Sequence, residues 1–210
     1  MRKVGTRFSA ELQELDPDAL RAAAERAVME ELAPIARPDE RLERAAEIIH
    51  QADAEIALHV QERDEAVASL WFYDHVLGIP AKAGIKPNAY REILSRVFYG
   101  GIERVPTESG RIPLRPIPDL PLPELAEAAR EAGVPVVKDA AKKLPRLATV
   151  VIEARARRAA AVVFMRNAAL ALSEEPYNWN APRIAAVAGV SRKLISQQQI
   201  TARRERDAKN

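Results

Sequence analysis

A stretch without proline or glycine runs from Asp39 to Leu77 and constrains the fold more than any other feature. Apolar residues share one heptad register along it, interrupted only at Arg63: Leu42, Ile49, Ile56, Leu70 and Leu77. This spacing predicts one amphipathic helix about 55 Å long. Its apolar stripe is either a packing surface for another helix of the same molecule or the seam of a coiled-coil homodimer.

The composition favours helices and a cytoplasmic protein. Alanine, leucine, glutamate and arginine dominate, and these residues lose little conformational freedom in a helix. Cysteine is absent, which excludes disulfides and thiolate metal sites and is typical of cytosolic proteins. Neither a signal peptide nor a run of about 18 apolar residues is present, so we expect no membrane segment. The high content of alanine and arginine suggests a bacterial genome rich in GC.

Prolines divide the chain into two halves. We predict an all-α protein with helical domains over residues 1–103 and 124–210, each a long helix plus a helix-turn-helix. Residues 104–123 hold six prolines and no periodicity, which indicates an extended linker or a strap lying over the surface. The other predicted helices span 19–32, 87–98, 125–132, 136–144 and 146–172, and residues 201–210 are expected to fray.

The charge is uneven along the chain. Residues 1–103 hold 13 basic and 19 acidic side chains, a net of −6, whereas residues 124–210 hold 16 and 9, a net of +7. Neutralising phosphates contributes much of the affinity for nucleic acids. The C-terminal half is therefore the better candidate to bind a polyanion, although it could also be an ordinary basic domain.

Residues 181–199 combine the features of two short helices joined by a sharp turn. Ala185 is small enough for close helix packing, and Gly189 suits a left-handed turn. Asn180 and Ser191 are suitable N-caps for the two helices. The positions expected to face the interior are all apolar: Ile184, Ala188, Val190 and Ile195.

This segment resembles the helix-turn-helix family of bacterial DNA-binding proteins. The resemblance implies that the helix starting at Ser191 enters the major groove of double-stranded DNA. By position, Arg192, Lys193 and Gln197 would then face the bases, with Ser196 close by. The residues expected to contact phosphates are Arg183, Arg203, Arg204 and Arg206. Gln198 stands where the family has an apolar residue, which predicts a displaced or frayed last turn.

A second, weaker copy of the pattern spans residues 79–98, with Gly84 in the place of Gly189. Pro80 replaces the small residue and should damage or bend the first helix. The polar residues that this copy would present to DNA are Lys86, Asn88, Arg91 and Glu92. The two turn glycines lie 105 residues apart, half the chain length, which suggests an internal duplication.

No set of residues indicates catalysis, a metal or a cofactor. His50, His59 and His75 are scattered along the long helix, and no phosphate-binding glycine loop or nucleophile motif is found. No small-molecule site is evident. Tyr177 and Trp179 lie in the loop before the C-terminal pattern and are expected to pin that loop to the core, or else to stack on a base.

These patterns predict a sequence-specific DNA-binding protein of the cytoplasm and nucleoid, acting as a transcriptional regulator rather than an enzyme. One alternative is a plasmid or phage protein for partition, replication or packaging of DNA. Another is a helical adaptor that binds its partner through residues 39–77.

Overall fold

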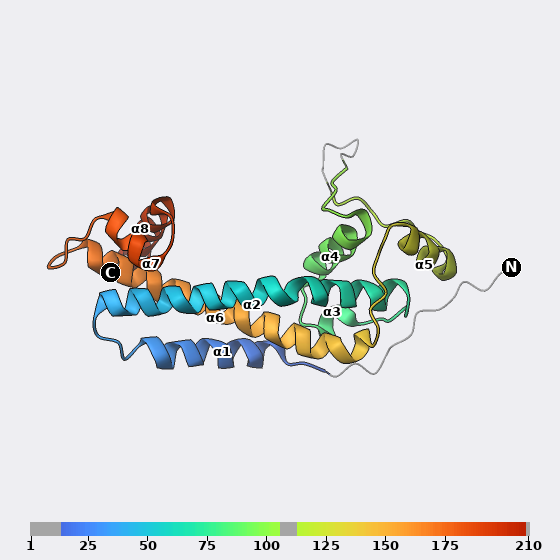
Figure 1. Ribbon diagram of the computed structural model, residues 1–210, viewed down its shortest axis with the longest axis horizontal. Helices are drawn as coiled ribbons and strands as arrows, with labels where there is room; N and C mark the ends of the chain where they lie inside the picture. The colour runs from blue at the N-terminus through green and yellow to red at the C-terminus, as the bar shows by residue number, and fades with distance from the viewer. Residues whose placement is uncertain (1–13, 106–112, 209–210) are drawn as a thin grey trace. The chain divides into compact units, whose positions relative to one another are not determined.

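The computed structural model describes residues 14–105 and 113–208, and the described part of the chain is helical, with no β-strand (Figure 1). The helices are α1 (Pro17–Leu32), α2 (Pro38–Phe72), α3 (Ile79–Lys82), α4 (Pro87–Tyr99), α5 (Leu122–Glu131), α6 (Ala140–Ser173), α7 (Ala181–Ala188) and α8 (Arg192–Asp207). The predicted all-α fold class is therefore confirmed. Among the described helices, none combines the length and apolar character that crossing a membrane requires.

The described residues form two compact units, which interleave along the chain. Unit 1 contains residues 14–17 and Ala57–Val151, and unit 2 contains residues 18–56 and 152–208. Each unit thus holds a part of α2 and a part of α6, because the boundaries between the units fall inside these two long helices. The predicted division into residues 1–103 and 124–210 is not confirmed, since the compact units do not follow the two halves of the sequence.

The proline-rich segment belongs to unit 1 and does not separate two domains. We call residues 113–121 the strap. Its backbone pairs with the residues after α4: Val105 N donates to Pro113 O over 3.1 Å, and Arg115 N donates to Glu103 O over 2.9 Å. The hydroxyl of Tyr99 donates to Pro116 O over 2.7 Å. These bonds fit the strap alternative for residues 113–121, while residues 106–112 of the predicted linker lie outside the described residues.

The helix α2 ends at Phe72, five residues before the predicted end at Leu77. His75 has a φ of 54°, which turns the chain back, and Val76 N donates to Leu70 O over 3.0 Å. This arrangement closes the helix as a glycine often does. A non-glycine residue in the left-handed region leaves no clear mark in a sequence, so the prediction extended the helix too far.

The helix α6 also differs from the prediction. We expected a helix over 136–144 and a break at Pro145, but residues 136–139 are not helical and α6 runs from Ala140 through Pro145. Lys142 N and Lys143 N both donate to Asp139 O, over 3.0 and 3.1 Å, which starts the helix. Pro145 follows only five residues after the start, where its missing N–H leaves one carbonyl of the first turns without its helical donor.

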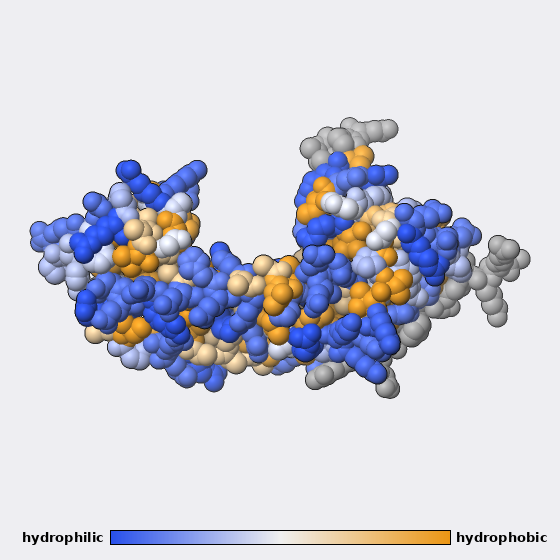
Figure 2. All heavy atoms as spheres, in the orientation of Figure 1, coloured by the Kyte–Doolittle hydropathy of each residue, from blue (hydrophilic) through white to orange (hydrophobic). Residues whose placement is uncertain are grey.

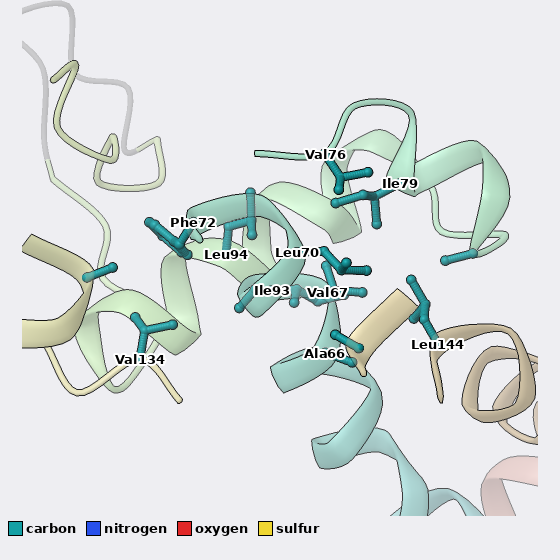
Figure 3. Packing of buried hydrophobic residues seen from close by; sticks show 14 of the residues in the cluster. Ala66, Val67, Leu70, Phe72, Val76, Ile79, Ile93, Leu94, Val134 and Leu144 are labelled. Atoms are coloured by element: carbon teal, nitrogen blue, oxygen red, sulfur yellow. The ribbon is translucent and has the colours of Figure 1, made fainter. Parts of the chain in front are cut away.

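Most of the apolar stripe of α2 is buried within the chain, although Ile56 is only partly buried and Leu77, beyond the end of α2, is exposed. In unit 2, Leu42 and Ile49 belong to a core that also includes Met165 and Leu172 of α6. In unit 1, Val67 and Leu70 pack in a core with Leu144 of α6 (Figure 3). This burial fits the intramolecular alternative for the stripe, and a homodimer through α2 stays a prediction.

The interruption of the heptad register is a buried ion pair. Arg63 and Asp64 are only 5% and 3% exposed, and Arg63 Nε donates to Asp64 Oδ1 over 2.9 Å. The other carboxylate oxygen of Asp64 accepts from Arg96 of α4. Because buried charges are costly unless they are paired, one carboxylate between two guanidinium groups explains how this register position tolerates arginine.

Tyr73 joins α2 to the segment after α5 in unit 1. Its hydroxyl donates to Val134 O over 2.6 Å, and nearby Val137 N donates to Ser69 Oγ over 3.0 Å. Burial raises the pKa of Tyr73 above its ordinary value of 10.0, because the phenolate would be poorly solvated there. The neutral phenol is therefore the form that stabilises the fold.

We predict that Tyr73→Phe lowers the free energy of unfolding by about 1 kcal/mol at pH 8, since Val134 O loses its donor. Because the pKa of Tyr73 is higher in the folded than in the unfolded chain, its contribution is complete below pH 10 and falls as the pH rises further. Urea unfolding of both proteins at pH 8 and pH 11 tests this. The gap between them should narrow at pH 11, and an unchanged gap would contradict the assignment.

Candidate functional site

The helix α7 begins and ends as predicted. Asn180 Oδ1 accepts from Arg183 N over 3.0 Å, which caps the start of the helix. Gly189 follows the last residue with a φ of 62°, and Val190 N then donates to Ala185 O over 3.1 Å. These bonds satisfy groups that a helix end would otherwise leave unpaired. The turn therefore depends on a glycine at position 189.

Unit 2 also limits the size of residue 189 from outside. A Cβ atom at this position would lie 3.1 Å from His50 Nε2 of α2. The same ring nitrogen donates to Ala188 O, at a distance of 3.4 Å. Backbone conformation and the nearby His50 ring therefore both disfavour a side chain at position 189.

The helix α8 starts as predicted but is longer than expected. Ser191 Oγ accepts from Leu194 N over 3.2 Å and caps the helix, which continues to Asp207 instead of ending at Gln199. The expected fraying of residues 201–207 is therefore wrong. At the standard rise, 16 residues make a helix about 24 Å long.

The structure explains the apparent misfit at Gln198. Ile195 is fully buried, and the next fully buried residue of α8 is Ala202, seven positions later on the same face. Between them, Gln199 Nε2 donates to Ala169 O of α6 over 3.2 Å. The hydrogen bond from the Gln199 side-chain amide and the small apolar contact of Ala202 thus take the place of the expected apolar residue. Ile200 is left 49% exposed.

Ion pairs attach the C-terminal end of α8 to the end of α6. Arg206 Nη1 lies 3.0 Å from Glu174 Oε1, and Arg166 Nη2 lies 2.6 Å from Glu205 Oε2. The carboxylate of Glu174 raises the pKa of Arg206 above its ordinary value. Arg206, which we expected to contact phosphate, is therefore engaged with Glu174 in this structure.

An exposed stripe runs along α8, opposite Ile195 and Ala202. We call it the α8 stripe, and its residues are Arg192, Lys193, Ser196, Gln197, Ile200, Arg203 and Arg204. Among the described residues, none of its four cations forms an ion pair. The face of α7 and α8 seen in Figure 2 is mostly hydrophilic, with a small apolar patch. Thus the predicted contact residues of α8 lie together on one solvent-facing side.

Arg183 and Trp179 extend this exposed region next to α7. Arg183 Cζ lies 3.7 Å from the centroid of the Trp179 ring, which holds an exposed guanidinium group in place. The side chain of Trp179 packs against the core of unit 2, and its backbone N–H donates to Leu172 O over 2.8 Å. The expectation that Trp179 pins its loop is confirmed, whereas Tyr177 is 43% exposed and does not do so.

The second copy of the pattern, in unit 1, is only partly like the first. Gly84 has a φ of 61° as predicted, but α3 is a single turn that contains Pro80, so the first helix is shortened. Lys86, Asn88 and Arg91 are all exposed on or before α4. Asn88 and Arg91 also line a groove between α4 and the strap, which no sequence pattern indicated.

Helix positions agree with an internal duplication. The helices α1 and α5 begin 105 residues apart, as do α4 and α8, while α2 and α6 begin 102 residues apart, as do α3 and α7. However, unit 1 combines α5 with α3 and α4, and unit 2 combines α1 with α7 and α8. The expectation of one helical bundle per half is therefore not met.

Comparison with protein-family models, with curated protein sequences and with solved structures yields no match. Within residues 14–105 and 113–208, no three histidine or acidic side chains gather as a metal site requires.

We predict that Gly189→Ala destabilises the protein by about 2 kcal/mol, because alanine is strained at a φ of 62° and its Cβ would displace His50. Gly101→Ala is the matched control, since φ at Gly101 lies outside the left-handed region and nothing lies within 4 Å of the added atom. The control should change stability by no more than about 1 kcal/mol. Urea unfolding measures both, and equal effects would show that the turn does not need glycine.

Proposed function

We propose that this chain is a sequence-specific double-stranded DNA-binding protein that acts as a transcriptional regulator and reads the major groove with α8. The observation that carries the proposal is the α8 stripe, whose N-terminal residues Arg192, Lys193 and Gln197 face solvent without ion-pair partners among the described residues. Side chains that are already paired would have to break those bonds before binding DNA. The cations of the α8 stripe can bind DNA without first breaking an ion pair of this kind.

The N-terminal half of the α8 stripe has the chemistry of base recognition. Arginine and lysine donate to O6 and N7 of guanine, and glutamine can pair with both N6 and N7 of adenine. Ser196 Oγ donates to Arg192 O over 3.1 Å within the helix, so this hydroxyl keeps a lone pair that can accept from a base. Ile200, exposed at the middle of the stripe, suits contact with the methyl group of thymine.

The surroundings of the stripe suit phosphate contacts. Residues 181–208 carry six basic and two acidic side chains, a local net charge of +4. Arg203 and Arg204 continue the stripe toward the C-terminal end, and Arg183 is held beside it by Trp179. The capped start of α8 at Ser191 adds backbone N–H groups, which favour a phosphate at a helix N-terminus. These groups would position the protein without reading the sequence.

A selection from random DNA duplexes, repeated at several salt concentrations, tests the proposal. We expect the wild-type protein to select one motif and to bind more weakly as salt increases, because phosphate contacts release counterions. Arg192→Ala with Lys193→Ala should abolish the motif, whereas Arg203→Ala with Arg204→Ala should weaken binding to all sequences similarly.

The control is Lys142→Ala with Lys143→Ala, which removes two adjacent exposed cations from the first turns of α6. It changes the net charge as much as the Arg192 and Lys193 variant, yet it should leave the selected motif and the affinity unchanged. If the Arg192 and Lys193 variant and the Lys142 and Lys143 control weaken binding equally, or if the wild type selects no sequence, α8 does not read DNA.

A further inference from the structure

Unit 1 contains a groove that the proposed DNA contacts do not use. It lies between α4, the strap and the start of α5, and its volume is about 940 Å³. Apolar and aromatic side chains form much of its lining, among them Trp71, Tyr90, Leu94 and Ile117. In Figure 2, apolar atoms reach the surface in the region of α4 and α5. Ligand pockets of proteins commonly have volumes of roughly 300 to 1,000 Å³ and mainly apolar walls.

A buried hydroxyl in this groove lacks a hydrogen bond. Ser95 of α4 is 2% exposed and lines the groove, and its Oγ has no hydrogen-bond partner. Leaving a buried hydroxyl unpaired is unfavourable, and most buried polar groups in proteins are paired. A bound molecule with a polar atom facing Ser95 would supply the missing bond.

One arginine of the groove lining is not engaged by an acidic side chain of the described residues. Its lining contains three arginines against two acidic residues, Glu92 and Asp119. Arg104 lies 3.5 Å from Glu92, and Arg115 lies 2.7 Å from Glu103 just outside the lining. Arg91 forms no ion pair within the described part of the chain, so its guanidinium group is available to a carboxylate, sulfonate or phosphate of a ligand.

We propose that this groove binds a small organic anion with a flat, mainly apolar body. The apolar walls beside Trp71 and Leu94 would take the body, Arg91 would take the anionic group, and Ser95 would pair with a polar atom of the ligand. This inference goes beyond the proposed function, because every residue in it belongs to unit 1 and none belongs to α8. Its test contains no DNA, so either proposal can fail alone.

The test titrates the full chain with 8-anilinonaphthalene-1-sulfonate, an aromatic anion whose fluorescence increases in apolar surroundings, and with the neutral analogue N-phenyl-1-naphthylamine. We expect one saturable site for the anion. Arg91→Gln should weaken anion binding about tenfold and leave binding of the neutral analogue unchanged, because only the sulfonate uses the guanidinium group. The matched control Lys86→Gln removes an exposed cation just before α4 that does not line the groove, and it should bind both probes like the wild type.

Energy transfer from tryptophan locates the bound probe. The chain has two tryptophans, of which Trp71 lines the groove and Trp179 packs in unit 2. In Trp179→Phe, the emission of Trp71 should be quenched as the probe binds, with the same affinity as in the wild type.

Thermal unfolding of Ser95→Ala tests the free hydroxyl separately. The variant should melt at or above the wild-type temperature, since removing an unpaired buried hydroxyl costs nothing in the free protein. Several degrees of destabilisation would show that the fold uses this hydroxyl. That result, the absence of a saturable site, or equal weakening by Arg91→Gln and Lys86→Gln would overturn the proposal.

Discussion

The structure depends on covering the apolar stripe of α2, which is too long for a short helix to bury. The second long helix, α6, covers it in both units: residues around Met165 pack near Leu42 in unit 2, and Leu144 packs near Val67 in unit 1. In unit 2, charged side chains beside the stripe join the same two helices, since Arg158 Nε lies 2.6 Å from Asp53 Oδ1. The shorter helices, α7 and α8 among them, complete these cores.

Features set by a few neighbouring residues could be predicted from the sequence. The caps at Asn180 and Ser191 and the left-handed turns at Gly84 and Gly189 were all predicted correctly. Each depends on a side chain that bonds to a nearby backbone N–H or on a backbone conformation that favours glycine. The long apolar stripe was also identified, because its spacing is regular over many turns.

Features set by distant contacts could not be predicted. The helix α8 continues past Gln199 because that side chain reaches Ala169 of α6 and because Ala202 is buried, and neither contact has a local signal. The end of α2 at Phe72 was missed for a local reason, because a left-handed histidine leaves no clear mark in a sequence. The groove in unit 1 again depends on distant contacts, because the strap forms one of its walls. The interleaving of the units was missed for the same reason, since the sequence does not reveal that both units would use parts of the same two long helices.

This interleaving has a consequence for how the chain becomes a folded protein. A ribosome would complete α1 to α4 before it makes either α5 or α6, yet each unit needs a part of α6. Until then, α2 has only α1, α3 and α4 to pack against, and a fragment ending at the strap would contain neither unit in full. The part of the stripe that α6 covers therefore stays exposed until the second half is synthesised.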